Sequence, residues 1–410
     1  VVVGVDTQNR FITSGFASFK SLDDEVCRPY DASRCGLNLG EACGAILLTR
    51  NRLSDSDVAI SGGAITDDAN HISGPSRTGD GLYFAMRMAM DEAGVIPRHL
   101  DMLQMHGTAT AYNDEMESKA ASLAGLQDVP AQSLKPYFGH TMGASGVIET
   151  IIAAEELKRG VCAGTAGFSE LGVPMPLNVS AANRELGENA VRHCLKTASG
   201  FGGTNAAVIL ESGGCGGGEV GGLLDIAFRE CREVVICDGS VKVDGEVVFA
   251  DENADYHAFI RDAFKAGGGQ NMKFYKMDDF CKLAYVAADR LLEGIDFGEE
   301  ECGMVLSGRY GCLDTDMKHQ QIIDSEGDAG ASPAVFVYTL PNVAAGEVSI
   351  RHHIKGENTW FWSDDRQMRD IRQYAGLMMA AQDLKYCMIG YFDCIAGKYE
   401  AVFKLLERQN

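Results

Sequence analysis

Apolar residues in the first half of the chain fall into short runs whose spacing alternates between that of helices and that of strands. Over residues 81–94 they recur every three or four positions and end at Gly94, which predicts an amphipathic helix. Compact apolar runs over 102–105 and 206–210 predict buried strands. The mostly apolar run over 147–154 predicts a helix that is buried on most sides and ends at Gly160.

Polar loops separate these elements. The strand expected over 102–105 leads into His106-Gly107-Thr108-Ala109-Thr110. Asp114 and Glu117 then have the spacing of a capping box, which predicts that a helix opens there and runs to Ala124. A strand, a loop with polar residues and a helix in succession are typical of the places where α/β folds carry their chemistry.

A glycine-rich stretch over 212–222 divides the chain. It has almost no side chains to bury, which predicts a flexible linker between one unit over 1–211 and another over 223–410. The length of 410 residues fits two domains. Because the chain opens in an apolar stretch without an initiator methionine, we expect residues 1–5 to lie in the middle of a fold.

The composition is that of a globular protein, with 46% hydrophobic and 23% charged residues. The net charge of −22 disfavours a nucleic-acid backbone or an anionic membrane as the main partner. We find no signal peptide and no apolar run long enough to span a membrane, so a cytoplasmic protein is expected. The 13 cysteines are scattered and form no CxxC pair, which favours reduced thiols over disulfides or a zinc ribbon.

Two histidines, His106 and His140, each stand next to glycine and threonine. They could bind a metal, but no third ligand has a suggestive spacing, so no metal site is predicted. A lone histidine is most often structural. Lys135, five residues before His140, and a Gly-Phe-Gly-Gly-Thr-Asn loop over 200–205 make a functional group the better interpretation.

These motifs occur in the order of a known family. The loop at 106–110 resembles an HGTxT motif, the segment 135–149 resembles K…GHTxGAxGxxE, and 200–205 matches GFGGTN. Upstream, a GF…RPFDxxRxGxxxGE pattern is resembled by Gly15-Phe16, Arg28-Pro29-Tyr30-Asp31, Arg34 and Gly40-Glu41. Residues 1–211 therefore resemble the C-terminal half of a β-ketoacyl-acyl-carrier-protein synthase. The resemblance implies an α/β thiolase-like fold, layered α-β-α-β-α and built from two related half-domains.

The resemblance also implies a chemistry. The family condenses an enzyme-bound acyl thioester with a malonyl thioester and releases carbon dioxide. Neutral imidazole N–H groups stabilise the enolate oxygen that decarboxylation builds, and by resemblance His106 and His140 supply them. Lys135 would lie near His140 and pair with Glu149, holding charge and geometry. A structural ion pair is an equally open and compatible interpretation of Lys135 and Glu149.

Other roles follow by resemblance. Thr108 and Thr110 would hydrogen-bond the phosphopantetheine arm of an acyl carrier protein, which is a substrate, and no cofactor is expected. The backbone N–H of Phe201 would supply half of an oxyanion hole, and its ring would gate the acyl pocket. Ala109 stands where glycine or serine is common, and Ser199 stands where many members have phenylalanine, which leaves the acyl preference open. A homodimer, or a heterodimer with another ketosynthase-type subunit, is expected.

The nucleophilic cysteine of the family lies at the N-terminus of a buried helix, before the strand that residues 1–5 resemble. Residues 223–410 resemble that missing half more weakly, through 276–288, 332–350 and 356–358.

Counting on from residue 358 puts Asp365 at the position of the cysteine, followed by a helix over 367–379 and a strand over 386–390. An aspartate cannot form the thioester, and Cys387 and Cys394 lie beyond that helix. The predicted site therefore has no nucleophile of its own.

Three arrangements stay open. The first unit could be part of an active synthase, with half of a partner subunit joined behind it. The two units could instead fold on each other as a permuted, cysteine-less whole, or the junction could be a fusion artefact. The strand near the junction occurs twice, at 1–5 and 386–390, which disfavours a clean permutation. The predicted function is decarboxylative condensation in fatty-acid or polyketide-type synthesis, and the alternative is a non-condensing, chain-length-factor-like partner.

Overall fold

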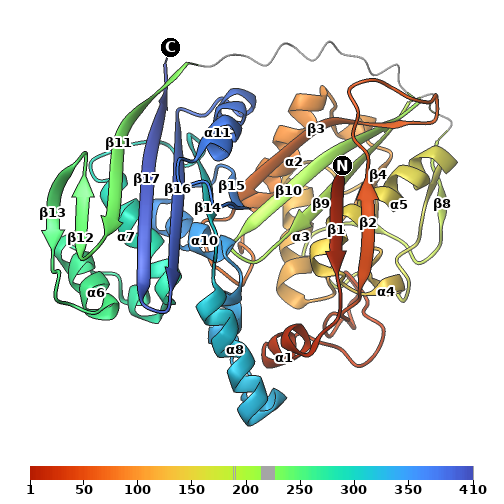
Figure 1. Ribbon diagram of the computed structural model, residues 1–410. Coiled ribbons are helices and arrows are strands. Elements are labelled where there is room, and N and C mark those ends of the chain that lie inside the picture. The colour runs from red at the N-terminus through yellow and green to blue at the C-terminus, as the bar shows by residue number, and fades with distance from the viewer. Residues whose placement is uncertain (188, 190, 214–226, 410) are drawn as a thin grey trace.

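The computed structural model describes residues 1–187, 189, 191–213 and 227–409. Two large mixed sheets lie side by side, each with helices on both faces (Figure 1). The linker predicted over 212–222 lies almost wholly outside the described residues. Its first residue, Ser212, still belongs to strand β10, so the predicted boundary falls one residue too early there.

The first large sheet has six strands, all drawn from residues 58–212. Its order is β3-β10-β9-β4-β5-β7. Strand β10 is antiparallel to both β3 and β9, whereas β9, β4, β5 and β7 run parallel to one another. The bounds are Val58–Asp67 (β3), Met102–Gln104 (β4), Pro130–Gln132 (β5), Asn178–Val179 (β7), Arg192–Ser199 (β9) and Thr204–Ser212 (β10). The strands predicted over 102–105 and 206–210 are β4 and β10.

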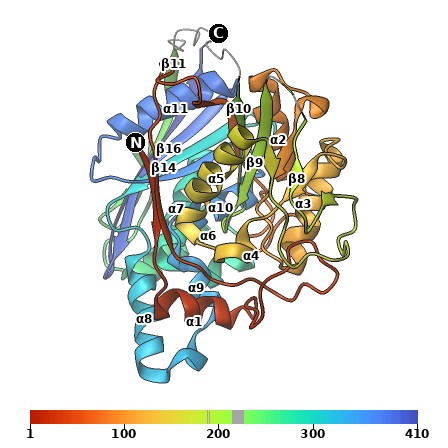
Figure 2. The ribbon, with the colours of Figure 1, turned by 90° about the vertical axis from the view of Figure 1, so that its right-hand side faces the viewer.

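Helices cover this sheet on both faces (Figure 2). Helices α2 (Asp80–Ala93) and α3 (Ala111–Leu123) pack on one face, and α5 (Ser145–Arg159) packs on the other. Gly94 and Gly160 end α2 and α5 in the left-handed conformation, which glycine adopts without a steric penalty. The capping-box prediction is wrong, because α3 begins at Ala111 with Thr110 as its N-cap.

The second large sheet has seven strands from residues 228–408, in the order β13-β12-β11-β17-β16-β14-β15. Helices α6 (Tyr256–Ala266), α7 (Asp279–Leu291) and α10 (Asn342–His352) cover one face, and α11 (Arg369–Ala381) covers the other. Helix α11 is the helix predicted over 367–379, and it begins two residues later than predicted, at Arg369. The strands are Phe228–Cys237 (β11), Ser240–Val243 (β12), Glu246–Ala250 (β13), Cys302–Gly308 (β14), Asn358–Trp362 (β15), Tyr386–Ile395 (β16) and Lys398–Arg408 (β17).

Residues 1–5 do not join either large sheet. Strand β1 (Val2–Asp6) pairs antiparallel with β2 (Ala42–Ile46), and these two strands form a separate sheet against α5. The remaining elements are short or peripheral: α1 (Arg10–Ser18), α4 (Lys135–Phe138), α8 (Leu313–Glu326), α9 (Pro333–Phe336), β6 (Val161–Cys162), β8 (Arg184–Glu185) and five 3-10 turns, Pro97–His99, Met142–Ala144, Met272–Lys276, Asp328–Gly330 and Val337–Thr339.

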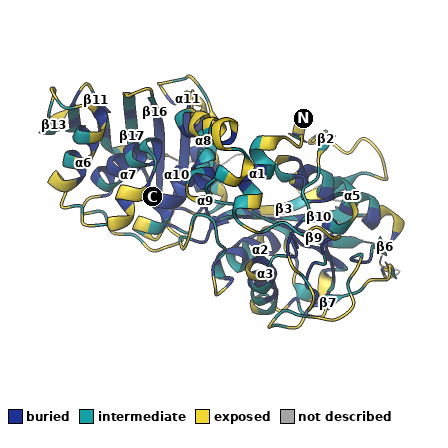
Figure 3. Ribbon diagram, turned by 90° about the horizontal axis from the view of Figure 1, so that it is seen from below, coloured by how far each residue is buried: buried dark blue, intermediate teal, exposed yellow. Residues whose placement is uncertain are grey.

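The two segments pack on each other through polar and aromatic contacts. Asn358 donates to the buried carboxylate of Asp67, and Lys355 forms an ion pair of 2.9 Å with Asp80. Asn342 Nδ2 donates to the carbonyl of Phe201 at 2.7 Å. Buried residues follow the strands of both sheets and continue where the segments meet (Figure 3).

An aromatic cluster also joins the segments. Phe16 of α1 stacks on Phe201 with ring centroids 5.9 Å apart and meets Phe336 of α9 edge-on at 5.4 Å. Phe336 lies directly over Gly15, where a β-carbon would come within 2.3 Å of the ring. Glycine at position 15 is therefore what allows α1 to approach α9.

Candidate active site

His106 stands in the loop that follows β4. The strand is fully buried, so its end fixes where the loop starts. Gly107 has φ +44°, and a β-carbon there would lie 2.5 Å from Ser133, so this turn requires glycine. The ring of His106 is almost fully buried, with 5% of the residue exposed.

Two buried carboxylates hold the loop over residues 106–110 through its backbone N–H groups. Glu117 accepts the backbone N–H groups of His106 at 2.8 Å and Gly107 at 2.7 Å, and Asp114 accepts that of Thr108 at 3.2 Å. Tyr30 completes the support: its hydroxyl donates to Glu117 at 3.0 Å, and its N–H donates to Asp114 at 2.7 Å. Asp114 and Glu117 therefore position the histidine loop, which corrects their predicted role as a helix cap.

His140 comes from the turn between α4 and α5. Its backbone is held by residues 38–40, because its N–H donates to Asn38 and its carbonyl accepts from Gly40. A β-carbon on Gly40 would lie 1.9 Å from the carbonyl oxygen of Phe138, so the two loops can meet only with glycine there. The rings of His106 and His140 meet edge to face with centroids 5.0 Å apart, as the sequence motifs led us to expect.

Lys135 lies beside His106, whereas the sequence comparison placed it near His140. Its Nζ donates to the carbonyl of His106 at 2.5 Å and lies 3.4 Å from that ring's Nδ1. It also pairs with Glu149 at 2.7 Å, with both side chains buried, so the predicted pair exists.

Lys196 of β9 is a member of this cluster that we did not predict. Its Nζ pairs with the other oxygen of Glu149 at 2.7 Å, and the side chain is 3% exposed. Lys196 follows Cys194 and Leu195 in the sequence, and a charged residue directly after apolar neighbours was a weak signal. Two lysines around one carboxylate leave the cluster with a net positive charge.

Both imidazoles are neutral. Burial lowers the pKa of His106 well below its usual value, with Lys135 adding to the effect. Burial, together with Lys135, lowers the pKa of His140 to about 3. Burial alone would raise the pKa of Glu149, but Lys135 and Lys196 hold it at about 2, so this carboxylate is charged.

The partners of the rings fix which nitrogen carries the proton. The N–H of Met142 donates to Nδ1 of His140 at 3.2 Å, and the ammonium group of Lys135 faces Nδ1 of His106. Each Nδ1 is therefore an acceptor, and a neutral ring then carries its proton on Nε2. The site presents two Nε2–H donors from facing rings beside a positive charge.

The other predicted residues lie around this pair. The hydroxyls of Thr108 and Thr110 hydrogen-bond each other at 2.8 Å in the loop after His106. Phe201 packs with Phe16 and Phe19, and its carbonyl accepts from Asn342. The roles of the two threonines and of Phe201 toward a substrate stay predictions.

Asp365 lies in the loop between β15 and α11. Its carboxylate accepts the N–H groups of Gln367 and Arg369 and pairs with the Arg369 side chain at 3.1 Å. Hydrogen bonding by Arg369 lowers the pKa of Asp365, so the residue is an anion that holds the start of α11 and cannot form a thioester. Cys387 packs beneath α11, and burial raises its pKa well above the usual value.

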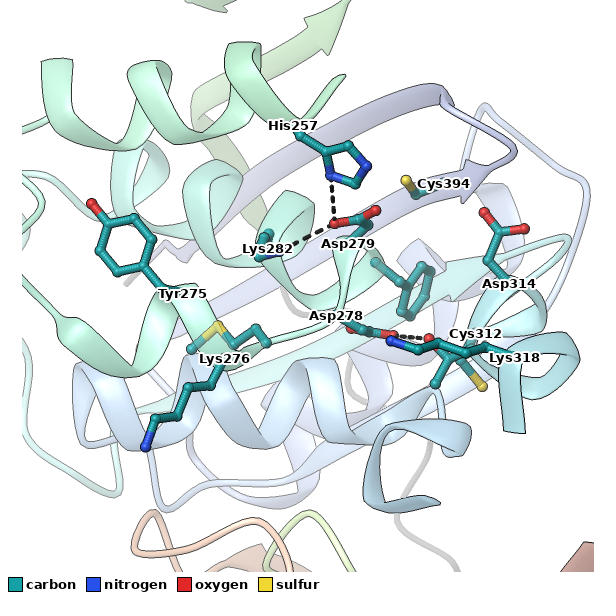
Figure 4. A pocket seen from close by; sticks show the side chains of 13 residues that line it. His257, Tyr275, Lys276, Asp278, Asp279, Lys282, Cys312, Asp314, Lys318 and Cys394 are labelled. Carbon is teal, nitrogen blue, oxygen red and sulfur yellow. Dashed lines mark hydrogen bonds and ion pairs between the residues drawn. The ribbon is translucent and has the colours of Figure 1, made fainter. Parts of the chain in front are cut away.

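A pocket of about 400 Å³ opens in the second segment around the N-termini of α7 and α8 (Figure 4). Its carboxylates are paired: Asp278 accepts from Thr315 at 2.7 Å, and Asp279 pairs with Lys282 at 3.2 Å. Cys394 faces this pocket, and burial raises the pKa of its thiol. Among the residues that the structure describes, no group of three or more His, Cys, Asp and Glu is arranged to hold a metal ion.

Comparisons with known proteins find the same family that the motifs resemble. Residues 58–169 match the family profile described as "Beta-ketoacyl synthase, C-terminal domain". The chain is 30% identical over 222 residues to a putative mitochondrial 3-oxoacyl-[acyl-carrier-protein] synthase of Schizosaccharomyces pombe, a match that covers 50% of this chain and 52% of that protein. It is 31% identical over 219 residues to 3-oxoacyl-[acyl-carrier-protein] synthase 2 of Rhizobium meliloti, covering 49% and 51%. The chain thus spans about half the length of the curated relatives it matches.

A solved structure extends the likeness in fold to the whole chain. The structure titled "PfaC Keto synthase-Chain length factor" aligns with a TM-score of 0.70 at 14% identity, covering 99% of this chain and 55% of that one. The fold is therefore thiolase-like, as predicted. The profile match places the similarity to the C-terminal domain of β-ketoacyl synthases in residues 58–169. None of the helices in the described ranges is long and apolar enough to cross a membrane.

Proposed function

We propose that the facing pair of His106 and His140 promotes the decarboxylation of a malonyl thioester in a β-ketoacyl synthase reaction. The bond between C2 and the carboxylate carbon breaks, carbon dioxide leaves, and the electron pair forms an enolate. The enolate carbon then attacks an acyl thioester on a cysteine, and the thiolate leaves as the β-ketoacyl product forms. The observation that carries this proposal is the pair of neutral rings, His106 buried and His140 partly buried, with both Nδ1 atoms already occupied.

The electrostatics of the cluster favour this step. Two Nε2–H donors that both reached the substrate oxygen would stabilise an oxyanion more than a carbonyl, which lowers the barrier and not merely the energy of the bound substrate. Lys135 and Lys196 with Glu149 keep a positive charge nearby, which disfavours imidazolium and favours an enolate. Lys135 and Glu149 therefore position the ring of His106, and neither needs to move a proton.

The substrate and the partners belong to the same proposal. The curated relatives are named for the acyl carrier protein, and we assign Thr108 and Thr110 to the phosphopantetheine arm of such a carrier, with no further cofactor. Phe201 would offer its N–H to the acyl oxyanion. The protein would work in the cytoplasm, as a homodimer or as a heterodimer with another ketosynthase-type subunit.

Decarboxylation tests this function without requiring a nucleophile. The full chain is incubated with malonyl-acyl carrier protein, and acetyl-acyl carrier protein is followed by mass spectrometry. We expect turnover that His106→Ala and His140→Ala each abolish, whereas His99→Ala, an exposed histidine in the same segment, leaves it unchanged. The same assay with a cysteine-bearing synthase half and an acyl donor should give a β-ketoacyl product. The proposal would be overturned if neither the acetyl product nor the β-ketoacyl product formed under any pairing.

The alternative is a non-condensing partner resembling a chain-length factor, and Asp365 favours it. The residue at the position of the nucleophile is bound to Arg369 and to the start of α11. The solved structure with the same fold includes a chain length factor in its title. Labelling the isolated chain with a cerulenin-like acyl mimic tests this alternative, because specific modification of one cysteine would contradict it.

A further inference from the structure

The two large sheets share one pattern of five strands. In the first, β3-β10-β9-β4-β5 are joined by two antiparallel and then two parallel pairings. In the second, β11-β17-β16-β14-β15 are joined in the same way. In both, the last two strands of the unit along the chain, β9–β10 and β16–β17, form the antiparallel pair in the middle. The earlier strand of each pair has a parallel neighbour, and the later one pairs with the strand of its sheet that comes first along the chain.

Strands β1 and β2 are a third antiparallel pair, and they lack these neighbours. They form a two-stranded sheet with Val3 opposite Ala45 and Val5 opposite Cys43. Within the described residues, neither the outer edge of β1 nor that of β2 has a strand beside it. An unpaired edge presents a row of N–H and C=O groups that another strand can pair with.

One face of this pair is built for close packing. Gly4 and Gly44 face α5, where a β-carbon on Gly4 would lie 3.0 Å from Val147 and one on Gly44 would lie 2.7 Å from Ile148. The pair therefore fits tightly against the helix that also carries Glu149. Figure 2 shows β1 running beside α5.

The opposite face is apolar and bare. Side chains alternate along a strand, so Val3 and Val5 point away from α5, and they are 59% and 56% exposed. The corresponding strand β16 is buried on both faces, with Met388 under α7 and Ile389 under α11. The central pair of the six-stranded sheet likewise has helices on both sides. The β1–β2 pair thus has a helix on one face only, whereas the β9–β10 and β16–β17 pairs have helices on both faces.

We infer that the β1–β2 sheet is the docking surface for a ketosynthase N-terminal half that carries the nucleophilic cysteine. Such a half would add a strand parallel to β1, a strand antiparallel to β2, and helices over Val3 and Val5. The strand pattern of both complete sheets argues for this occupant, and the alignment of the chain with about half of each relative agrees with it.

The second segment cannot fill this surface, because its β16 and β17 already occupy the central places of a complete sheet. The second segment of another copy of the chain could not fill the surface either, because its sheet is complete in the same way. The inference rests on the proposed function for the identity of the partner, while the strand pairing is a separate property that binding alone can measure.

The test co-expresses the full chain with a tagged N-terminal half of the Rhizobium meliloti relative, the part outside its match to this chain. We expect the two to purify together and the amides of residues 2–6 to gain protection from hydrogen exchange. Val3→Lys with Val5→Lys should weaken the complex at least ~10-fold, because lysine would be buried unpaired beneath the incoming helices. Val247→Lys, an exposed valine on β13 at the edge of the other sheet, is the matched control and should bind as the wild type does.

Three results would overturn the inference. They are no complex with this half, a complex that the Val3 and Val5 substitutions leave intact, and protection confined to the 227–409 segment. Self-association of the chain alone that the two lysines abolish would assign the surface to a second copy instead. His106→Ala should leave the complex intact while it stops decarboxylation, so failure of the docking surface and failure of the proposed chemistry give different results.

Discussion

The ring of His106 meets that of His140 edge to face, with the two centroids 5.0 Å apart. His106 stands in the loop after β4 and His140 in the turn between α4 and α5, and each ring has its Nδ1 facing a donor. This arrangement leaves both Nε2–H groups for a ligand. We expect His106→Ala and His140→Ala each to lower the rate of malonyl decarboxylation at least ~100-fold, the usual effect of removing one oxyanion donor. Rates are compared by the release of labelled carbon dioxide, and a fall below threefold in either variant would contradict the donor role.

Glu149 is the single carboxylate between two buried lysines. Glu149→Gln leaves Lys135 and Lys196 without a charged partner, and breaking a buried pair in this way costs about 3–5 kcal/mol in the free energy of unfolding. Urea denaturation measures the change. Glu155→Gln lies on the same helix but in an exposed pair with Lys158, and it should barely alter the midpoint. Equal effects of the two substitutions would show that the buried cluster contributes nothing particular.

The low pKa of His140 makes the free energy of unfolding depend on pH. Its pKa is about 3 in the folded protein against an ordinary value of 6.5, so between these values the unfolded chain binds the additional proton. The free energy of unfolding therefore falls as pH drops through this window, by about 1–2 kcal/mol from this residue between pH 7 and pH 5.

His140→Asn should remove that part of the loss. The burial that raises the pKa of Asp114 to about 7 acts in the opposite direction, because the folded form then binds the additional proton. The comparison is therefore made between the wild type and His140→Asn, with Asp114 present in both. Identical pH profiles from chemical denaturation would contradict the depressed pKa.

Gly15 is the contact point between α1 and α9. A β-carbon there would overlap the ring of Phe336, so Gly15→Ala should destabilise the protein by about 1–3 kcal/mol even though alanine favours helices. Gly146→Ala, on α5 with open space around it, should instead be neutral or stabilising. Phe336→Ala should make the protein tolerant of Gly15→Ala, and a thermal-melting cycle of these variants checks it.

Much of the site could be predicted from local sequence. The loop over 106–110, the segment 135–149 and the loop over 200–205 have fixed spacings, because each includes a tight turn between two regular elements. These spacings led to His106, His140 and the Lys135–Glu149 pair. The helix ends at Gly94 and Gly160 were equally local, since a left-handed residue at a helix end favours glycine.

Contacts between distant positions could not be predicted in this way. Lys196 reaches Glu149 from a strand 47 residues further along the chain, and no periodicity encodes that meeting. Asp114 and Glu117 had the spacing of a helix cap, but the fold turned them under the loop of His106, where backbone N–H groups needed acceptors. Lys135 contacts His106 and not His140 because of how the loops that carry the two histidines pack, and local sequence does not encode that packing.

The sequence by itself determined the resemblance to a family, the order of the motifs and the presence of Asp365 where the family has cysteine, because these depend on residue types and short spacings. Only the tertiary structure decided that both imidazoles keep Nδ1 occupied and that the segments meet through Asp67 and Asn358. It also decided that β1 and β2 stand apart as an uncovered pair. Hydrogen-bond partners, burial and strand neighbours arise from parts of the chain that are far apart in sequence and are brought together by packing.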